Sequence, residues 1–154
     1  MATLSTDLFV LCDYATVSRE QKLSVIGIFD QFFVANVPTN WPKMFLVAVL
    51  SGQAGQEYPI TLKIIPPVSP SEASGEGRAK TEQNFPDKEL KVTLGQNGKA
   101  NLITELVNFP LPLPGNYKVE IESEGTKVSS LEFKVNKTTA TYGGQDLAGK
   151  KVSN

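Results

Sequence analysis

Hydrophobic and polar residues alternate along most of the chain in short runs, separated by Gly, Pro and Asn. A period of two places successive side chains on opposite faces of a β-strand, whereas an amphipathic helix needs a period of 3.6. The pattern predicts strands at residues 7–15, 22–34, 43–51, 58–65, 79–85, 89–94, 100–107, 117–123 and 127–136. Many short, closely spaced strands favour an all-β, immunoglobulin-like β-sandwich of about seven to nine antiparallel strands, with a barrel as the alternative.

Turn signals separate the predicted strands and set the limits of the domain. Asn97-Gly98 and Glu124-Gly125 each predict a hairpin between the strands that flank them. Prolines at 110, 112 and 114 predict a rigid crossover between sheets, because proline cannot donate to a central strand ladder. Residues 66–77 predict an exposed loop, and residues 137–154 a flexible C-terminal tail that is too poor in apolar residues to repay ordering. The domain is therefore expected to span residues 1–136.

The strands in the two halves of the chain predict different surroundings. Residues 117–123 and 131–135 alternate apolar residues with Lys and Glu, which predicts one dry and one solvated face. The first three predicted strands are instead apolar on both faces. In residues 22–34 one face carries Leu23, Val25, Gly27 and Phe29, and the other carries Ile26, Ile28 and Phe32. Strands of this kind need cover on both faces.

Three coverings could satisfy the second apolar face: the loops at 35–42 and 108–114, a barrel-like curl of the sheet, or another protein chain. A large apolar patch left in water commonly marks a partner surface, because burial contributes about 25 cal/mol per Å². We therefore expect a non-enzymatic interaction or structural module that self-associates or docks a protein partner through this face. The expected binding residues are Ile28, Phe32, Phe33, Trp41, Phe45 and Val47.

The aromatic residues around the loop at 38–42 leave a second interpretation open. Aromatic rings can stack on sugar rings, and Gln31, Asn36 and Asn40 supply polar groups nearby. The alternative is therefore a small-ligand or carbohydrate-binding sandwich that uses the aromatics around Trp41. The same rings serve equally well as a lid or an interface, which we favour.

Composition excludes several classes of function. The chain has 154 residues, of which 40% are hydrophobic, and its 15 Lys and Arg nearly balance 16 Asp and Glu. This is enough apolar material for one core, but there is no basic excess to neutralise the phosphates of a nucleic acid. Histidine is absent, which removes histidine-dependent nucleophilic or acid–base catalysis and imidazole zinc sites. No glycine-rich phosphate loop precedes a helix.

The remaining candidate groups for chemistry are few. Cys12 is the only cysteine, so it cannot form an intramolecular disulfide, and its apolar strand predicts a buried, unreactive thiol. Asp13 follows Cys12 near the end of the first predicted strand, and Asp30 closes the segment Gly27-Ile28-Phe29-Asp30. The two could bind a cation or act as an acid–base pair, but such residues more often form turns. We expect no enzyme, no catalytic or metal-binding residues and no cofactor.

The N-terminus predicts a cytoplasmic protein that does not bind membranes. Its longest apolar run covers residues 8–12, and no Lys or Arg comes before it. A signal peptide needs a charged start and roughly 7–15 apolar residues, and a membrane-spanning helix needs about 20.

Several segments of the chain together carry a family resemblance. They are Cys12-Asp13-Tyr14-Ala15, the run LSVIGIFD at residues 23–30, a Pro-containing loop with an apolar strand, and Gly115-Asn116-Tyr117-Lys118-Val119. This arrangement resembles an uncharacterised bacterial β-sandwich domain family of unknown function, over about residues 7–136. The GIFD segment is the most specific part. The resemblance implies a small β-sandwich with no established activity, so no functional residues carry over from it.

Overall fold

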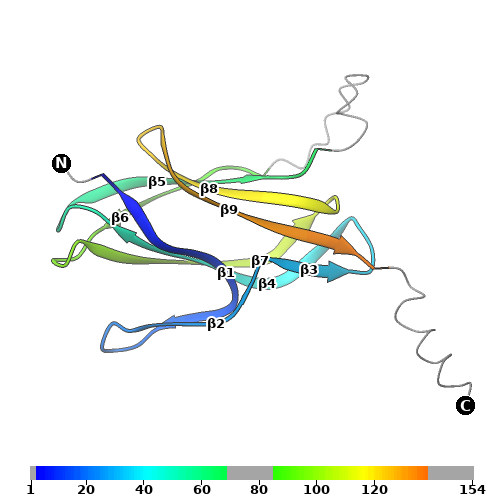
Figure 1. Cartoon of the computed structure of the whole chain (residues 1–154), viewed down its shortest axis with the longest axis horizontal. Helices are drawn as coiled ribbons and strands as arrows, with labels where there is room; N and C mark the ends of the chain where they lie inside the picture. Colours follow the sequence, from blue (N-terminus) through cyan, green and yellow to red (C-terminus); the bar gives the residue numbers. More distant parts are fainter. Residues whose placement is uncertain (1–2, 69–84, 139–154) are drawn as a thin grey trace, which may run out of the picture.

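The computed structural model describes residues 3–68 and 85–138, and these residues form two packed β-sheets (Figure 1). The strands are β1 (Ser5–Val17), β2 (Leu23–Phe29), β3 (Gln31–Val34), β4 (Thr39–Ser51), β5 (Glu57–Ile65), β6 (Lys88–Thr93), β7 (Lys99–Leu111), β8 (Gly115–Ser123) and β9 (Thr126–Lys137). One sheet has the order β2-β1-β4-β7 and the other β3-β9-β8-β5-β6. The predicted all-β sandwich is confirmed, with a parallel β3–β9 pair that the prediction of antiparallel strands did not include.

The main core lies between the two sheets and is rich in aromatic rings. Tyr117 stacks on Phe133 with ring centroids 5.1 Å apart, and Phe133 stacks on Phe32 at 5.7 Å. The Tyr117 hydroxyl donates to the carbonyl of Leu113 at 2.6 Å, which satisfies its polar atom inside the core. On β8, Tyr117, Val119 and Ile121 are at most 1% exposed. The alternation predicted for residues 117–123 is therefore confirmed.

The predicted strand at 22–34 is wrong as a single element, because the chain changes sheets in its middle. β2 ends at Phe29 in the four-stranded sheet, and β3 pairs with β9 in the five-stranded sheet. The carbonyl of Asp30 accepts a hydrogen bond from the backbone N–H of Lys134 at 2.9 Å, so this residue is where the chain joins the second sheet. Phe32 consequently lies in the main core and does not share a face with Ile28. The face that points into the main core shifts at Asp30, so Phe29 and Phe32, three residues apart, both contact it. Apolar residues continue on both sides of Asp30, so the pattern did not reveal the break.

The connections confirm two of the predicted turns and correct a third. Glu124 and Gly125 adopt φ of 51° and 77° between the paired strands β8 and β9, which confirms that hairpin. The proline segment at 110–114 carries the chain from β7 to β8 in the other sheet, which confirms the crossover. Asn97-Gly98 also lies between sheets, because β6 and β7 do not pair, so the hairpin predicted there is wrong.

Some sequence predictions concern residues beyond the described part. The predicted loop at 66–77 is described only to residue 68, and the predicted strand at 79–85 only at Phe85. The predicted tail at 137–154 is described only to residue 138, where β9 has just ended. Within residues 3–68 and 85–138, no helix is long and apolar enough to cross a membrane.

Candidate functional site

A second hydrophobic cluster lies on the outer face of the four-stranded sheet. Along β4, Leu46 and Ala48 face the main core, whereas Phe45 and Val47 belong to this outer cluster. Its buried members are Cys12, Ala15, Phe45 and Val47, and Leu8, Val10, Leu23, Val25 and Ile103 pack against them. The prediction that these strands bury apolar side chains on both faces is thus confirmed for β1 and β4, whereas Ile26 and Ile28 on β2 remain exposed.

The sheet itself covers part of this outer face. Leu23 and Val25 of β2 pack against the outer cluster, although β2 pairs only with β1. In Figure 1, β2 lies on the side of β4 and β7 that is opposite β8 and β9. The four-stranded sheet therefore curls so that its edge strand, β2, covers part of the outer face of the same sheet. A barrel-like curl was one of the three coverings expected from the sequence.

The loops expected at 35–42 and 108–114 close the main core instead. Thr39 pairs with Leu111, so about half of each segment belongs to the ends of β4 and β7. Trp41 packs against the main core and stacks on Phe32, with centroids 4.3 Å apart. The expectation that these loops could cover the second apolar face is therefore wrong, because their apolar side chains already fill the space between the sheets.

Four large apolar side chains remain exposed on the four-stranded sheet, and we call them the outer patch: Tyr14, Ile26, Ile28 and Val107. Their exposed fractions are 49%, 58%, 60% and 58%. Tyr14 lies opposite Ile26 in the β1–β2 pair, and Ile28 lies opposite the buried Cys12. Residues directly opposite one another in an antiparallel pair have neighbouring side chains, so β1 and β2 contribute a continuous apolar surface.

Phe45 connects this surface to Val107 on the far side of β4. The Tyr14 ring packs edge-on against Phe45 with centroids 5.5 Å apart. The Lys43 ammonium lies 5.5 Å from the centroid of the Phe45 ring and 2.9 Å from a carboxylate oxygen of Glu105. Lys43 is itself opposite Val107 in the β4–β7 pair. The outer patch thus crosses the sheet with a neutralised ion pair between its apolar parts.

The six residues expected to bind a partner lie in three places. Ile28 belongs to the outer patch, and Phe45 and Val47 lie buried beneath it in the outer cluster. Phe32 and Trp41 belong to the main core, and Phe33 is 59% exposed on β3 of the other sheet. The four aromatics therefore do not share one surface.

Three members of the outer patch were not predicted from the sequence. Tyr14 could have been predicted, because it follows Cys12 by two residues and therefore lies on the same face of the strand. Ile26 was assigned to the right face but was not chosen as a binding residue. Val107 gave no usable signal, because a single sequence does not show that β7 lies beside β4.

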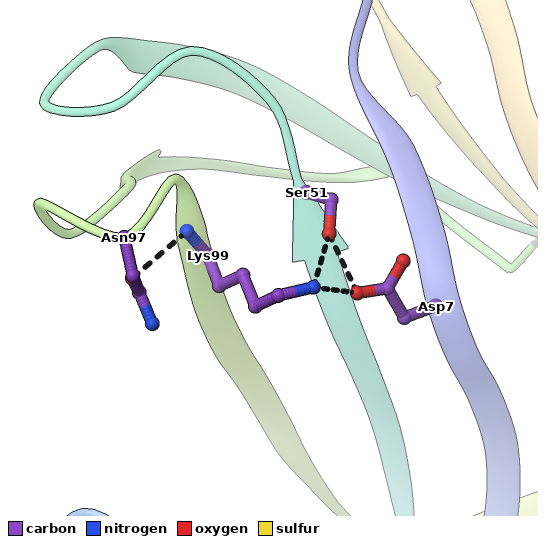
Figure 2. A network of polar contacts seen from close by, with 4 residues as sticks. All are labelled: Asp7, Ser51, Asn97 and Lys99. Carbon is purple, nitrogen blue, oxygen red and sulfur yellow. Dashed lines mark hydrogen bonds and ion pairs between the residues drawn. The ribbon is translucent and has the colours of Figure 1, made fainter.

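A polar network joins the ends of three strands in the four-stranded sheet (Figure 2). The Ser51 hydroxyl donates to Asp7 at 2.6 Å, and the Lys99 ammonium lies 3.0 Å from Ser51 and also pairs with Asp7. Asn97 accepts a hydrogen bond from the backbone N–H of Lys99 at 3.1 Å, which fixes the start of β7. The network therefore ties β1, β4 and β7 together at one edge of the sandwich.

The Ser51–Lys99 contact resembles a nucleophile–base pair but lacks the electrostatics for that role. A lysine acts as a general base only when it is neutral, whereas the Lys99 side chain is here engaged in an ion pair with the Asp7 carboxylate. The backbone N–H that follows Ser51, on Gly52, already donates to the carbonyl of Gly98 at 2.9 Å. It is thus engaged and does not offer a donor for an oxyanion. We interpret the network as structural.

This network makes a prediction for the pH dependence of stability. Hydrogen bonds from Lys99 and then Ser51 lower the pKa of Asp7. A carboxyl group with a lowered pKa stabilises the folded protein at pH values above its pKa in the unfolded chain, about 4. This contribution is lost as the pH falls through its pKa in the folded protein. Lys99→Met should therefore lower the melting temperature slightly at pH 7 and should cease to do so at pH 2. Thermal unfolding of both proteins over this range tests the prediction.

Lys91→Met provides the matched control for that measurement. Lys91 lies 3.7 Å from Glu57, beyond hydrogen-bonding distance, and both side chains are exposed. The control should show no comparable loss between pH 7 and pH 2. An equal pH dependence of the two variants would contradict the assigned role of Asp7.

The other candidate groups occupy structural positions. Cys12 is fully buried, as predicted, and burial raises the pKa of its thiol. Asp13 lies against Gly27, where a Cβ would come within 2.4 Å of its carboxylate oxygen; Gly27 also has a φ of +71° that favours glycine. Among the described residues, no group of three or more His, Cys, Asp or Glu is placed to hold a metal ion.

Comparison with solved structures shows the fold alone. An alkylpurine DNA glycosylase, AlkC, from Pseudomonas fluorescens matches with a TM-score of 0.51 and 14% identity over 88% of this chain and 31% of that chain. A β-glucosidase from Bifidobacterium adolescentis matches with a TM-score of 0.48 and 12% identity, over 88% of this chain and 17% of that one. A β-glucosidase from Listeria innocua in complex with glucose has a TM-score of 0.47 and 10% identity, with coverage of 90% and 16%. This chain thus spans less than a third of each of these proteins.

Sequence comparison identifies the family. No curated protein sequence matches the chain. A family model, described as a family of unknown function, matches residues 7–136. This range agrees with the resemblance carried by the CDYA and GIFD segments, and it covers all nine strands except the first two residues of β1 and the last residue of β9. The chain therefore belongs to the family of unknown function DUF6941.

Proposed function

We propose that the protein is a non-catalytic interaction module that binds another protein through the outer patch. The observation that supports this proposal is the exposure of Tyr14, Ile26, Ile28 and Val107, each about half or more in solvent on one sheet. Contiguous exposed apolar side chains are uncommon on monomeric proteins and commonly mark interaction surfaces. Burying their exposed halves would contribute on the order of 4 kcal/mol to association.

The ion pair within the patch indicates the chemistry of the partner surface. Lys43 and Glu105 neutralise one another at 2.9 Å, and both side chains remain about half exposed. A partner therefore meets an apolar surface with no net charge, and it need not supply a charge of its own to the ion pair. The partner surface that fits best is itself apolar at its centre and close to neutral.

A charge placed in the patch should abolish association without unfolding the protein. Val107 is 58% exposed, so Val107→Asp leaves the new carboxylate in water in the free protein. In a complex the same carboxylate would be buried beside Lys43 and Glu105, whose charges already neutralise one another, so it would add an uncompensated negative charge. We expect this charge to weaken binding at least about tenfold. Light scattering after size-exclusion chromatography, over a hundredfold concentration range, measures self-association. Immobilised protein measures the binding of other proteins.

Ile65→Asp is the matched control, because Ile65 is 43% exposed on the five-stranded sheet. The proposal is supported if Val107→Asp loses self-association or a captured protein and Ile65→Asp keeps it. Both variants must also unfold cooperatively, which shows that they are folded. The proposal is overturned if the wild type is monomeric at all concentrations and Val107→Asp captures every protein that the wild type captures. The outer patch would then not be an interaction surface.

A further inference from the structure

The strand β2 lacks the features that protect the other sheet edges from pairing. A strand at the edge of a sheet presents unpaired N–H and C=O groups, and proteins usually block them with charges, proline or short length. Among the described edges, β6 carries Lys88, Glu89 and Lys91, and β7 carries Lys99, Glu105 and Pro110. The third edge, β3, has only four residues. In contrast, β2 has seven residues, LSVIGIF, with neither a charge nor a proline.

The side chains of β2 add an apolar surface to this open edge. Ile26 and Ile28 belong to the outer patch and are the two most exposed isoleucines of the described chain. Their strand pairs with β1 on one side only. A strand that is open along its backbone and apolar on its side chains is suited to pair with another strand.

The charges that flank β2 identify which strand fits it. Lys22 lies four residues before Ile26, and Asp30 lies four residues after it; both are exposed. If two copies of β2 pair antiparallel with Ile26 opposite Ile26 of the second copy, Lys22 falls opposite Asp30 of the second copy at each end. The segment is thus complementary to itself, with opposite charges at its ends and no charge between them.

We infer that β2 pairs antiparallel with β2 of a second copy of this chain, centred on Ile26, and joins the two four-stranded sheets into one continuous sheet. This inference names the partner of the β2 part of the outer patch, Ile26 and Ile28, and therefore rests on the proposed function. In this arrangement Ser24 lies opposite Ile28 of the second copy. Gly27, beside the two-fold axis, has a φ of +71°, so the pairing of the two copies is interrupted at this residue, as the β1–β2 pairing is.

Disulfide trapping tests the predicted register. Residues directly opposite in such a pair have Cα atoms within about 4.4–6.8 Å, where a disulfide can form. Ile26→Cys should give a covalent dimer under mild oxidation, while the native Cys12 is fully buried. An equal mixture of Ser24→Cys and Ile28→Cys should crosslink more than either variant alone. The control Ile65→Cys, on the other sheet, should give no covalent dimer.

Charge reversal tests the contact at the ends of the paired strands. Lys22→Asp would place two carboxylates together at both ends of the interface, so the dimer dissociation constant should rise about tenfold or more. Combining Lys22→Asp with Asp30→Lys should restore dimerisation. Lys88→Asp makes the same reversal at the start of the edge strand β6 and should leave the dissociation constant unchanged.

The outcomes separate this inference from the proposed function. A dimer that crosslinks through Ile26→Cys and recovers in the charge-reversed double variant supports the strand pairing and the β2 part of the outer patch. Because Val107 lies on the opposite edge of this sheet, only a loss of association in Val107→Asp supports the whole patch. If the β2 variants leave the dimer unchanged but Val107→Asp abolishes it, the strand pairing is overturned and the outer patch is retained as the interface. A wild-type protein that is monomeric at all concentrations overturns the strand pairing, whether or not the patch captures a different protein.

Discussion

Val47→Asp is expected to unfold the protein, whereas the same carboxylate at Ile28 is expected to leave it folded. Both residues were expected from the sequence to line one binding surface, but Val47 is fully buried in the outer cluster and Ile28 is 60% exposed. An aspartate at position 47 would lie between Val10 and Ile103, its neighbours on β1 and β7, with no cation to pair with. Burying an unpaired carboxylate costs several kcal/mol, which is comparable to the whole stability of a small domain.

Urea denaturation followed by circular dichroism measures this contrast. Val47→Asp should show no cooperative transition, or one whose free energy of unfolding is lower by at least about 4 kcal/mol. Ile28→Asp should change that free energy by about 0.5 kcal/mol or less in a sample dilute enough to be monomeric. A folded Val47→Asp protein would mean that the curl of β2 does not seal the outer cluster.

Phe133→Ala is expected to produce the second large effect, a loss of about 3–5 kcal/mol in the free energy of unfolding. The side chain is 1% exposed and lies at the centre of the main core. Its ring contacts those of Tyr117, Phe32 and Phe109 with centroid distances of 5.1, 5.7 and 6.1 Å. Truncation would remove these contacts and leave a cavity that the rings of both sheets border, which rigid strands cannot close.

Phe33→Ala is the matched control, since it removes the same ring from the neighbouring strand β3. Phe33 is 59% exposed, so its truncation should change the free energy of unfolding by less than about 1 kcal/mol. Thermal and urea unfolding of the two variants together give the comparison. Equal losses at the two positions would contradict the placement of Phe133 in the main core.

The sequence predicted best those strands that have one solvated face. β8 and β9 alternate apolar residues with Lys and Glu, so their faces, their boundaries and the turn at Glu124-Gly125 could be read directly. β2 and β3 could not be separated, because apolar residues continue on both sides of Asp30. The pairing of β7 with β4 was equally hidden, since it joins residues more than fifty positions apart, such as Lys43 and Val107.

The sequence predicted an apolar surface on the first strands, but it identified only some of the residues that form it. Apolar faces on both sides of β4 indicated that something must cover the outer one, and part of that cover is the curl of β2. Ile28 was correctly placed on this face. Phe32 and Trp41 were not, because their aromatic character suits a core and an interface equally, and only the change of sheet at Asp30 decides between them.

The parallel pair β3–β9 sets an order in which the chain can fold during synthesis. Gln31 lies beside Lys134, so β3, near the start of the chain, cannot pair until β9, the last strand, has been synthesised. A ribosome that has released the first hundred residues exposes β3 without its neighbour, and Phe32 cannot enter its place beside Phe133. Contacts between such distant residues make folding slow, because a long loop must close first. The five-stranded sheet is therefore completed only after nearly the whole domain has left the exit tunnel, and until then β3 remains an unpaired, aggregation-prone segment for chaperones to hold.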